Sequence, residues 1–318
     1  MPQASQSIIH KLESLRRSVH LHCYQMTGSL QDAEDLTQEA LTKAWERFES
    51  FRKDAELATW VYQIATNTCL DFLRGKQRRN LGWGKAFPQY RLGEPLPAIL
   101  PEILWLEPYP DPVDQTVLKD QVSLAYLALL QALPPRQRAV FIVTEVLGYT
   151  AKETADLLEM TPTAVNSALQ RARKTIGPGV KLDPLDTSDQ SELLARFMSA
   201  WEAGDAQAIV NLMRDDVRMV MPPYPLWVQG RPEVRQVLID YPLNKGTDRW
   251  KLVPTVRANG NPAFGFYFKG DDGIFRGWGI QVVMIDQSSS GPARIQDYHV
   301  FKGPPLVSLF GLPDPWQE

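Results

Sequence analysis

An aspartate and a histidine near the end of the chain are residue types that acid–base chemistry uses. Asp297 and His299 lie two positions apart in a run with strand character, so their side chains point to the same face. A buried carboxylate beside an imidazole could act as a general acid–base pair. The alternative is a packed core with a hydrogen-bonded histidine, which leaves Asp297 and His299 as weak catalytic candidates.

The other metal-ligating residue types show no pattern of a cofactor site. The four histidines and two cysteines lack metal-ligand spacing, so we expect neither a metal nor another cofactor. Cys23 and Cys69 suggest no disulfide framework, which favours a reducing cytoplasm. No apolar run approaches the roughly 18–20 residues that span a bilayer, and the first residues lack the apolar block of a signal peptide, so we expect no membrane partner.

Charge is distributed unevenly along a chain whose formal net charge is −3. Residues 32–56 hold eight acidic and four basic residues. Residues 72–91 hold six basic residues and residues 160–182 hold four, and neither stretch has an acidic one. One acidic and two basic surfaces indicate more than one partner, while the net charge argues against strong stand-alone binding to nucleic acid.

The segment YTAKETADLLEMTPTAVNSALQRARKTI has the pattern of a helix-turn-helix. Thr150 can cap a short helix, with Glu153 completing a capping box. Thr161 can cap a second helix, with Pro162 at its first position, where a missing N–H group costs nothing. The turn between them is tight, although glycine is frequent where this chain has Glu159.

The second helix of such a motif lies in the major groove, where polar side chains suit base edges and basic ones suit phosphates. The alternative is a pair of helices in an unrelated bundle. Base-edge candidates are Thr161, Thr163, Asn166, Ser167 and Gln170, and phosphate candidates are Arg171, Arg173 and Lys174.

The segment ELATWVYQIATNTCLDFLRGKQRR carries the other basic patch. Aromatic residues alternate there with basic ones, and unpaired bases need aromatic planes beside a cationic track. The alternative places Trp60 and Phe72 in a core and the basic run on a solvated face. The candidates for DNA contact are Trp60, Asn67, Asp71, Arg74, Lys76, Arg78 and Arg79.

Helices must position these residues in the first part of the chain, and strands in the last. Apolar spacing predicts helices at 29–48, 56–74, 114–132 and 135–147, the first of them with Leu36, Ala40, Leu41, Ala44, Trp45 and Phe48 on its apolar face. Ser29, with Asp32 three residues later, gives this first helix a start that resembles a capping box. After residue 190, two helices broken at Gly204–Asp205 precede a short helix at 231–239 and strand-like runs. The runs are 217–221, 225–230, 251–258, 263–270, 274–286 and 293–301, which predict an α+β module with a curved antiparallel sheet.

Three stretches resemble known families. DAEDLTQEALTKAW followed by ATWVYQIATNTCLDFLRGKQRR resembles region 2 of bacterial sigma-70 family sigma factors of the extracytoplasmic-function (ECF) type. LPPRQRAVFIVTEVLGYTAKETADLLEMTPTAVNSALQRARK resembles region 4 of the same family. The last module, with LLARFMSAWEAGD and a final FGLP, resembles the SnoaL-like (ketosteroid-isomerase-type, nuclear-transport-factor-2-like) cone that follows a subgroup of these factors.

The resemblance implies a multidomain fold of two all-α sigma domains followed by an α+β cone with a curved antiparallel sheet. The implied parts are region 2 (1–80), a linker (81–113), region 4 with its helix-turn-helix (114–178), a second linker (179–190) and the SnoaL-like domain (191–318).

The resemblance also implies a sigma factor, not an enzyme, whose partners are the RNA polymerase core and promoter DNA. Asp35, Gln38 and Glu39 would face the β′ clamp helices, and complementary charge would set the register. The 60–79 patch would read the minus-ten element, and the helix-turn-helix, near the β flap, the minus-thirty-five element. The first linker would thread toward the polymerase active site, with Glu94, Glu102, Glu107 and Asp111 suited to that channel.

The cone leaves more than one function open. It could regulate the factor through a small-molecule ligand or a protein regulator, with a pocket lined by Trp201, Met221, Trp227, Phe266 and Trp278. Two rival functions remain for the whole chain: a stand-alone helix-turn-helix regulator, or a SnoaL-like isomerase or cyclase fused to a DNA-binding head.

Overall fold

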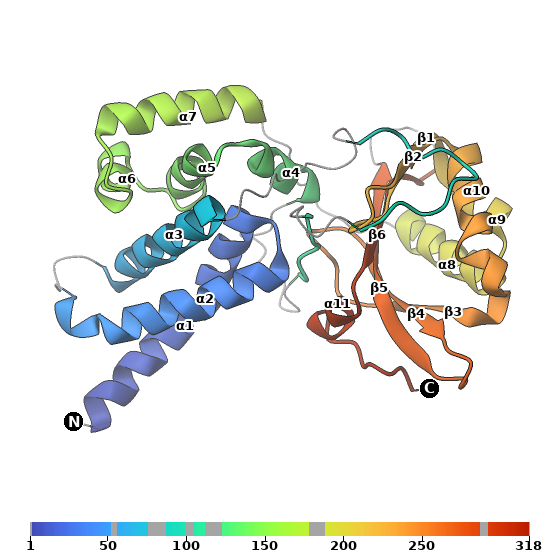
Figure 1. Cartoon of the computed structure of the whole chain (residues 1–318), viewed down its shortest axis with the longest axis horizontal. Helices are drawn as coiled ribbons and strands as arrows, with labels where there is room; N and C mark the ends of the chain where they lie inside the picture. The colour runs from blue at the N-terminus through green and yellow to red at the C-terminus, as the bar shows by residue number, and fades with distance from the viewer. Residues whose placement is uncertain are drawn as a thin grey trace. The chain divides into compact units, whose positions relative to one another are not determined.

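Figure 1 shows the computed structural model of the chain, which describes residues 2–51, 56–75, 87–99, 105–111, 123–177, 188–286 and 292–317. The described residues belong to two compact units. The first unit draws on Met1–Gly82, Glu102–Glu107 and Ala125–Val180, and the second on Trp83–Pro101, Pro108–Leu124 and Lys181–Glu318. In the described part of the chain, no helix is both long and apolar enough to cross a membrane.

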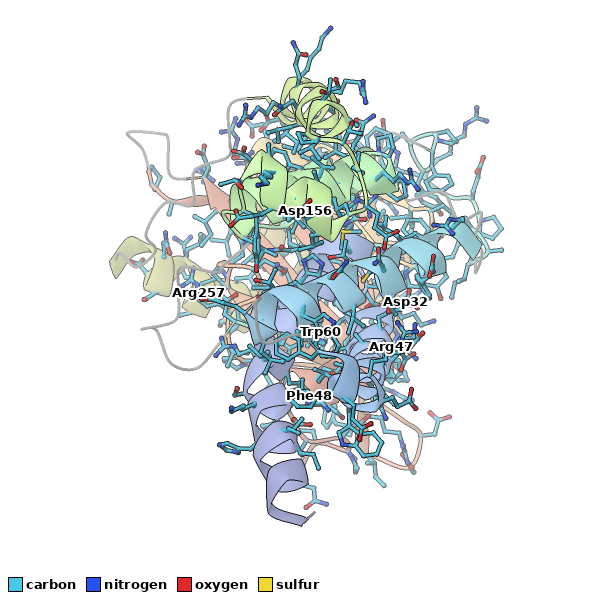
Figure 2. All side chains as sticks on the ribbon, turned by 90° about the vertical axis from the view of Figure 1, so that its left-hand side faces the viewer. Asp32, Arg47, Phe48, Trp60, Asp156 and Arg257 are labelled. Atoms are coloured by element: carbon cyan, nitrogen blue, oxygen red, sulfur yellow. The ribbon has the colours of Figure 1, made fainter. Side chains whose placement is uncertain are left out.

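The first unit begins with three helices that pack against one another (Figure 1). They are α1 (Pro2–Thr27), α2 (Leu30–Glu46) and α3 (Leu57–Gly75), with the short helix η1 (Phe48–Ser50) after α2. Ser29 caps α2 by accepting a hydrogen bond from the Asp32 backbone N–H at 3.2 Å, as its sequence predicts. Phe51, after η1, contacts the ring of Trp60 of α3 at a centroid distance of 5.0 Å and the ring of Phe48 at 5.8 Å; Phe48 and Trp60 are labelled in Figure 2.

The rest of the first unit is the helix-turn-helix and the helices before it. They are α4 (Leu124–Ala132), α5 (Pro135–Phe141), a π-helical turn η3 (Ile142–Val146), α6 (Ala151–Leu157) and α7 (Pro162–Ile176). The predicted 135–147 helix is therefore correct in place but changes from α to π geometry after Phe141. Part of the predicted 114–132 helix lies outside the described residues, and the described helix begins at Leu124.

Local capping sets the geometry of the helix-turn-helix. Thr150 and Glu153 form the predicted capping box, and Thr161 accepts a hydrogen bond from the Ala164 backbone N–H at 3.2 Å. Glu159 makes the turn with a φ of +52°, the left-handed conformation for which glycine is usual. Both helix caps are confirmed, and the turn closes without glycine.

The second unit is a six-stranded sheet with helices packed on it (Figure 1). The strands are β1 (Met213–Val220), β2 (Trp227–Gln229), β3 (Trp250–Pro254), β4 (Ala263–Lys269), β5 (Phe275–Asp286) and β6 (Arg294–Lys302). The helices are α8 (Ser188–Glu202), α9 (Ala206–Asn211), α10 (Arg231–Asp240) and α11 (Pro304–Leu309), with the short helices η4 (Leu243–Lys245) and η5 (Thr247–Arg249) before β3. Asp205 caps α9 by accepting from the Ala208 N–H at 2.9 Å, which confirms the predicted break at Gly204–Asp205.

The sheet corrects the prediction that all its strands are antiparallel. The strand order is β2-β1-β6-β5-β4-β3, an open sheet with β2 and β3 at its edges. β1 and β6 run parallel, whereas the other four pairs are antiparallel, so the sheet is mixed. β1 and β6 are far apart in sequence, and this pairing is set by long-range packing that no local pattern records.

Pieces of the predicted first linker are bound rather than extended in solvent. In the second unit, the Trp227 indole donates to the Phe87 carbonyl at 2.9 Å, and Asp111 accepts from the Gly260 N–H at 2.9 Å. In the first unit, Glu107 accepts hydrogen bonds from the start of α2. The linker acids Glu107 and Asp111 therefore have protein partners, while Glu102 lies outside the described residues.

Candidate nucleic-acid interface

Helix α7 presents the predicted base-edge residues to solvent. Its opposite face is buried, through Val165, Ala168, Leu169, Ala172 and Ile176. α7 therefore has both a buried face, as a helix of an unrelated bundle would, and an exposed polar face, as a recognition helix would. Thr161, Thr163, Asn166 and Gln170 are exposed, and Ser167 is half-buried.

The basic end of α7 is also exposed, but one of its arginines is paired. Arg171 and Lys174 are exposed, whereas Arg173 donates to Glu145 at 2.6 Å. An ion pair at the surface contributes about 0–1 kcal/mol, so a phosphate can replace Glu145 at little cost. All three basic residues therefore remain suited to phosphate contacts.

Helix α3 holds the described part of the aromatic and basic patch. Trp60 and Asn67 are half-buried, and Asp71 and Arg74 are exposed and joined by an ion pair at 3.2 Å. Lys76, Arg78 and Arg79 lie outside the described residues. Trp60 is thus neither fully in the core nor free, because one side of its ring packs on Phe51.

Helix α2 exposes the predicted acidic face. Asp35, Gln38 and Glu39 are all exposed, on the side of α2 opposite its buried residues. Glu39 forms an ion pair with Lys43 at 2.6 Å, and Glu34 lies 3.4 Å from Arg16. The carboxylates therefore keep an outward orientation that a cationic surface could meet.

The prediction that Trp45 belongs to the apolar face of this helix is wrong. Its side chain is 54% exposed. Trp45 follows the buried Ala44 by one residue, which turns it about 100° around the helix, out of the buried stripe. It lies seven positions after Gln38, on the same side of α2 as the acidic face, and this spacing is the signal that sequence reasoning missed.

A buried arginine that sequence reasoning missed anchors α5. Arg138 donates to the carbonyl oxygens of Gln131 at 3.1 Å and Leu133 at 3.0 Å, and also to the carbonyl of Met26. These carbonyls lie at the C-terminal ends of α4 and α1, where the helix dipole favours a positive charge. Burial lowers the pKa of Arg138 to about 9.

A second contact joins α3 to the segment before α6. The Thr59 hydroxyl of α3 lies 3.0 Å from the Tyr149 hydroxyl, just before α6.

In the second unit, the acid–base candidates lie away from the aromatic interior. Asp297 pairs with Arg218 at 2.9 Å, and His299 lies 4.0 Å from Asp297. Burial alone would raise the pKa of Asp297, but His299 and Arg218 outweigh it and hold that pKa below its usual range. Burial lowers the pKa of His299 to about 4. Tyr298, between them, points to the other face, where its ring contacts Phe197.

The predicted pocket residues are brought together only in part. Trp201 and Trp278 both contact the ring of Phe266, at centroid distances of 5.1 and 5.5 Å, and Met221 belongs to the same buried cluster. Trp227 instead lies in the edge strand β2, where it is bound to Phe87. Sequence reasoning missed Gln281, which is fully buried in β5 and has no hydrogen-bond partner for its amide N or O atom among the described residues.

The first unit combines a surface that suits DNA with one that suits a positively charged partner. A capped helix-turn-helix presents a polar and basic face, and a separate helix presents acids. The sequence matches the Sigma-70 region 2 family over residues 12–79 and the Sigma-70 region 4 family over residues 123–176. These matches cover the acidic helix α2, the patch on α3 and the helix-turn-helix.

Relatives define the family more closely. The chain is 37% identical to the ECF RNA polymerase sigma factor SigG of Mycobacterium tuberculosis (strain ATCC 25618 / H37Rv) over 316 residues, which cover 95% of this chain and 83% of SigG. It is 28% identical to SigJ of the same strain over 66% of this chain and 63% of SigJ. This chain belongs to the ECF RNA polymerase sigma factors, which direct the polymerase core to promoter DNA.

A solved structure supports the fold of the whole chain. The crystal structure of the Mycobacterium tuberculosis sigma factor SigJ aligns with a TM-score of 0.61 at 21% identity, covering 96% of this chain and 100% of SigJ. At that identity the likeness establishes the fold alone. The predicted order, helical sigma domains followed by a domain of helices and sheet, is confirmed.

Proposed function

We propose that this sigma factor divides polymerase binding and promoter reading between opposite charges of its first unit. Asp35, Gln38 and Glu39 of α2 bind the β′ clamp helices of the RNA polymerase core. The single observation that carries this assignment is the outward orientation of all three side chains on one face of a well-packed helix. Complementary charge across that interface sets register and association rate.

DNA contacts are assigned to α3 and α7. On α3, the half-buried Trp60 and the exposed Arg74 suit an unpaired base and its backbone, as part of the minus-ten reader that continues through Lys76, Arg78 and Arg79. On α7, Thr161, Thr163, Asn166, Ser167 and Gln170 read base edges of the minus-thirty-five element. Arg171, Arg173 and Lys174 hold its phosphates, with the β flap as the adjoining polymerase surface.

The second unit is assigned a regulatory role, without catalysis of its own. Asp297 is engaged by Arg218, and its side chain lies on the face of β6 opposite Tyr298, so this acid–base pair does not line the aromatic interior that holds Tyr298. The unpartnered amide of Gln281 within that interior supports a small neutral ligand as regulator. For the whole chain we keep the boundaries that the sequence predicts: region 2 at 1–80, a linker at 81–113, region 4 at 114–178, a second linker at 179–190 and the SnoaL-like domain at 191–318. The working compartment is the cytoplasm.

The docking assignment is tested by reversing charge on α2. The variant D35K/E39K is expected to bind RNA polymerase core at least tenfold more weakly and to lose promoter-directed transcription. The matched control E192K/E202K changes two exposed acids of α8 and should bind as the parent chain does. Equal binding by both variants would reject the docking face.

The same assay separates the rival functions. A stand-alone helix-turn-helix regulator would occupy its site without polymerase and would be indifferent to D35K/E39K. An isomerase or cyclase would lose turnover in D297N, whereas a regulatory unit leaves transcription by this variant intact.

A further inference from the structure

A short piece of the first linker is bound to the corner where α1 meets α2. This piece, which we call the linker strap, comprises Trp105, Leu106 and Glu107. The Glu107 N–H donates to the Gly28 carbonyl at 2.9 Å, and the Tyr24 hydroxyl donates to the Glu107 carbonyl at 2.7 Å. The backbone of the strap is therefore held on both sides by the end of α1.

Gly28 provides the seat for the strap. Its φ is +74°, and a Cβ atom there would lie 2.6 Å from Leu106 Cδ2. Leu106 is only 3% exposed, so its side chain fills the space that the missing Cβ leaves. The glycine thus meets two needs at once, a left-handed turn and close contact with Leu106.

The Glu107 side chain closes the start of α2. One carboxylate oxygen accepts from the Leu30 N–H at 2.6 Å, from the Gln31 N–H at 3.3 Å and from the Ser29 hydroxyl at 3.2 Å. The first N–H groups of a helix have no partner within it, and the dipole makes that end positive, so a carboxylate there is stabilising. The Ser29 hydroxyl accepts from the Asp32 N–H, and the Glu107 carboxylate accepts from the N–H groups of Leu30 and Gln31.

The Glu107 carboxylate is buried at this corner. It is held in a site where burial raises the pKa of Glu107 and the Leu30 and Gln31 N–H groups oppose that rise. Asp32, in the first turn of α2, is the nearby acid that adds to the rise. Ser29 accepts from only one N–H group of the first turn, so the Leu30 and Gln31 N–H groups need another acceptor, and a distant part of the chain supplies it.

We infer that Glu107 is a positioning residue for polymerase binding: from the linker, it completes the first turn of α2 and so fixes the acidic face that follows. Asp35 lies four residues after Gln31, little more than one turn along the same helix. An ordered first turn holds Asp35 and Gln38 in one direction before the partner arrives, which lowers the ordering cost of binding. This inference rests on the proposed docking of α2.

Glu107 lies in an environment other than the one that the family resemblance implies for it. The family resemblance assigned this acid to a polymerase channel, together with Glu94. Its side chain in the structure instead faces the α2 N-terminus, whereas Glu94 lies 4.0 Å from Arg91 in the second unit. Two acids of one predicted linker thus have different environments, and Glu94 supplies a matched control.

The test compares E107Q with E94Q in the full chain. E107Q keeps the size of the side chain and removes its charge. We expect faster hydrogen exchange at the Leu30 and Gln31 amides and about fivefold weaker binding to RNA polymerase core, a change typical of a lost helix cap. E94Q should match the parent chain in both measurements. Y24F, which keeps the carboxylate but loosens the strap, should shift both readouts in the same direction by less.

Four outcomes distinguish the possibilities. Unchanged exchange at Leu30 and Gln31 in E107Q would overturn the cap itself. Faster exchange there with unchanged polymerase affinity would show a purely structural cap and overturn the positioning role. If D35K/E39K also binds normally, the docking proposal fails, whereas loss of binding by D35K/E39K but not by E107Q sinks the present inference alone. Exchange measured across the remaining helices identifies any general unfolding.

Discussion

Arg138 of α5 donates a hydrogen bond to the backbone carbonyl of Met26 at the end of α1. This bond joins the helices of region 4 to those of region 2 within one compact unit. Arg138 is buried and satisfies carbonyls at the ends of two helices, so it does the work of a C-terminal cap for both.

Removing this arginine should destabilise the first unit. In R138A, the carbonyls of Met26, Gln131 and Leu133 lose their donor in a buried setting, and the free energy of unfolding is expected to fall by about 3 kcal/mol. Denaturant unfolding measures the change. Arg136, two residues earlier and exposed, is the control, and R136A should stay within about 0.5 kcal/mol of the parent. A small loss in R138A would contradict the capping role.

Trp45 should act as an apolar anchor of the acidic face. A large, exposed aromatic side chain surrounded by polar residues is typical of the centre of a binding site. W45A is expected to weaken binding to polymerase core about tenfold while changing the unfolding free energy by less than about 0.5 kcal/mol. Ile9, 47% exposed on α1, gives the comparison: I9A should bind normally. Normal binding by W45A would confine the docking surface to Asp35, Gln38 and Glu39.

Two residues of α7 should have different effects on DNA binding by the polymerase holoenzyme. Asn166 is placed for a base edge, so N166A should lose about 1–3 kcal/mol at one position of the minus-thirty-five element and relax specificity there. Arg171 is placed for a phosphate, so R171A should weaken all sequences alike and reduce the salt slope by about 1. Affinity for a set of single-base promoter variants at several salt concentrations distinguishes them. Sequence-selective loss in R171A would reverse the assignments.

The buried histidine of α1 should make stability depend on pH. Burial lowers the pKa of His22 to about 4 from an ordinary value of 6.5, and its Nε2 lies 2.8 Å from the Thr66 hydroxyl beside the Tyr62 ring. The folded chain therefore resists protonation that the unfolded chain accepts. The contribution of His22 to the free energy of unfolding is therefore fully present above pH 6.5. It falls as the pH drops from 6.5 toward 4, and the loss is about 2 kcal/mol at pH 5.

Unfolding free energies measured from pH 7.5 to 4.5 test this dependence. H22Q should make the profile less steep in that window, although it lowers stability at pH 7; His299, whose pKa burial also lowers to about 4, keeps its own contribution in the second unit. The exposed His10 offers a control, and H10Q should reproduce the parent profile. A parallel shift of the H22Q profile, without flattening, would show that another group controls the acid response.

Local chemistry in the sequence specified the caps, the turn and most of the elements. Ser29, Thr150 and Thr161 cap the helices they were expected to cap, because a hydroxyl reaches an N–H group only two or three residues away. All six strand-like runs and the break at Gly204–Asp205 are present, since alternation and turn residues act over short distances. The motifs of regions 2 and 4 likewise identified the family from the sequence.

Tertiary structure alone decided which of several equivalent residues is buried, paired or bound. Arg136 and Arg138 are the same residue type two positions apart, yet only the second meets the ends of α1 and α4. The parallel pairing of β1 with β6 and the attachment of Glu107 to α2 join residues far apart in the chain. Hydrogen bonds and burial act between neighbours in space, and a sequence pattern records only neighbours along the chain.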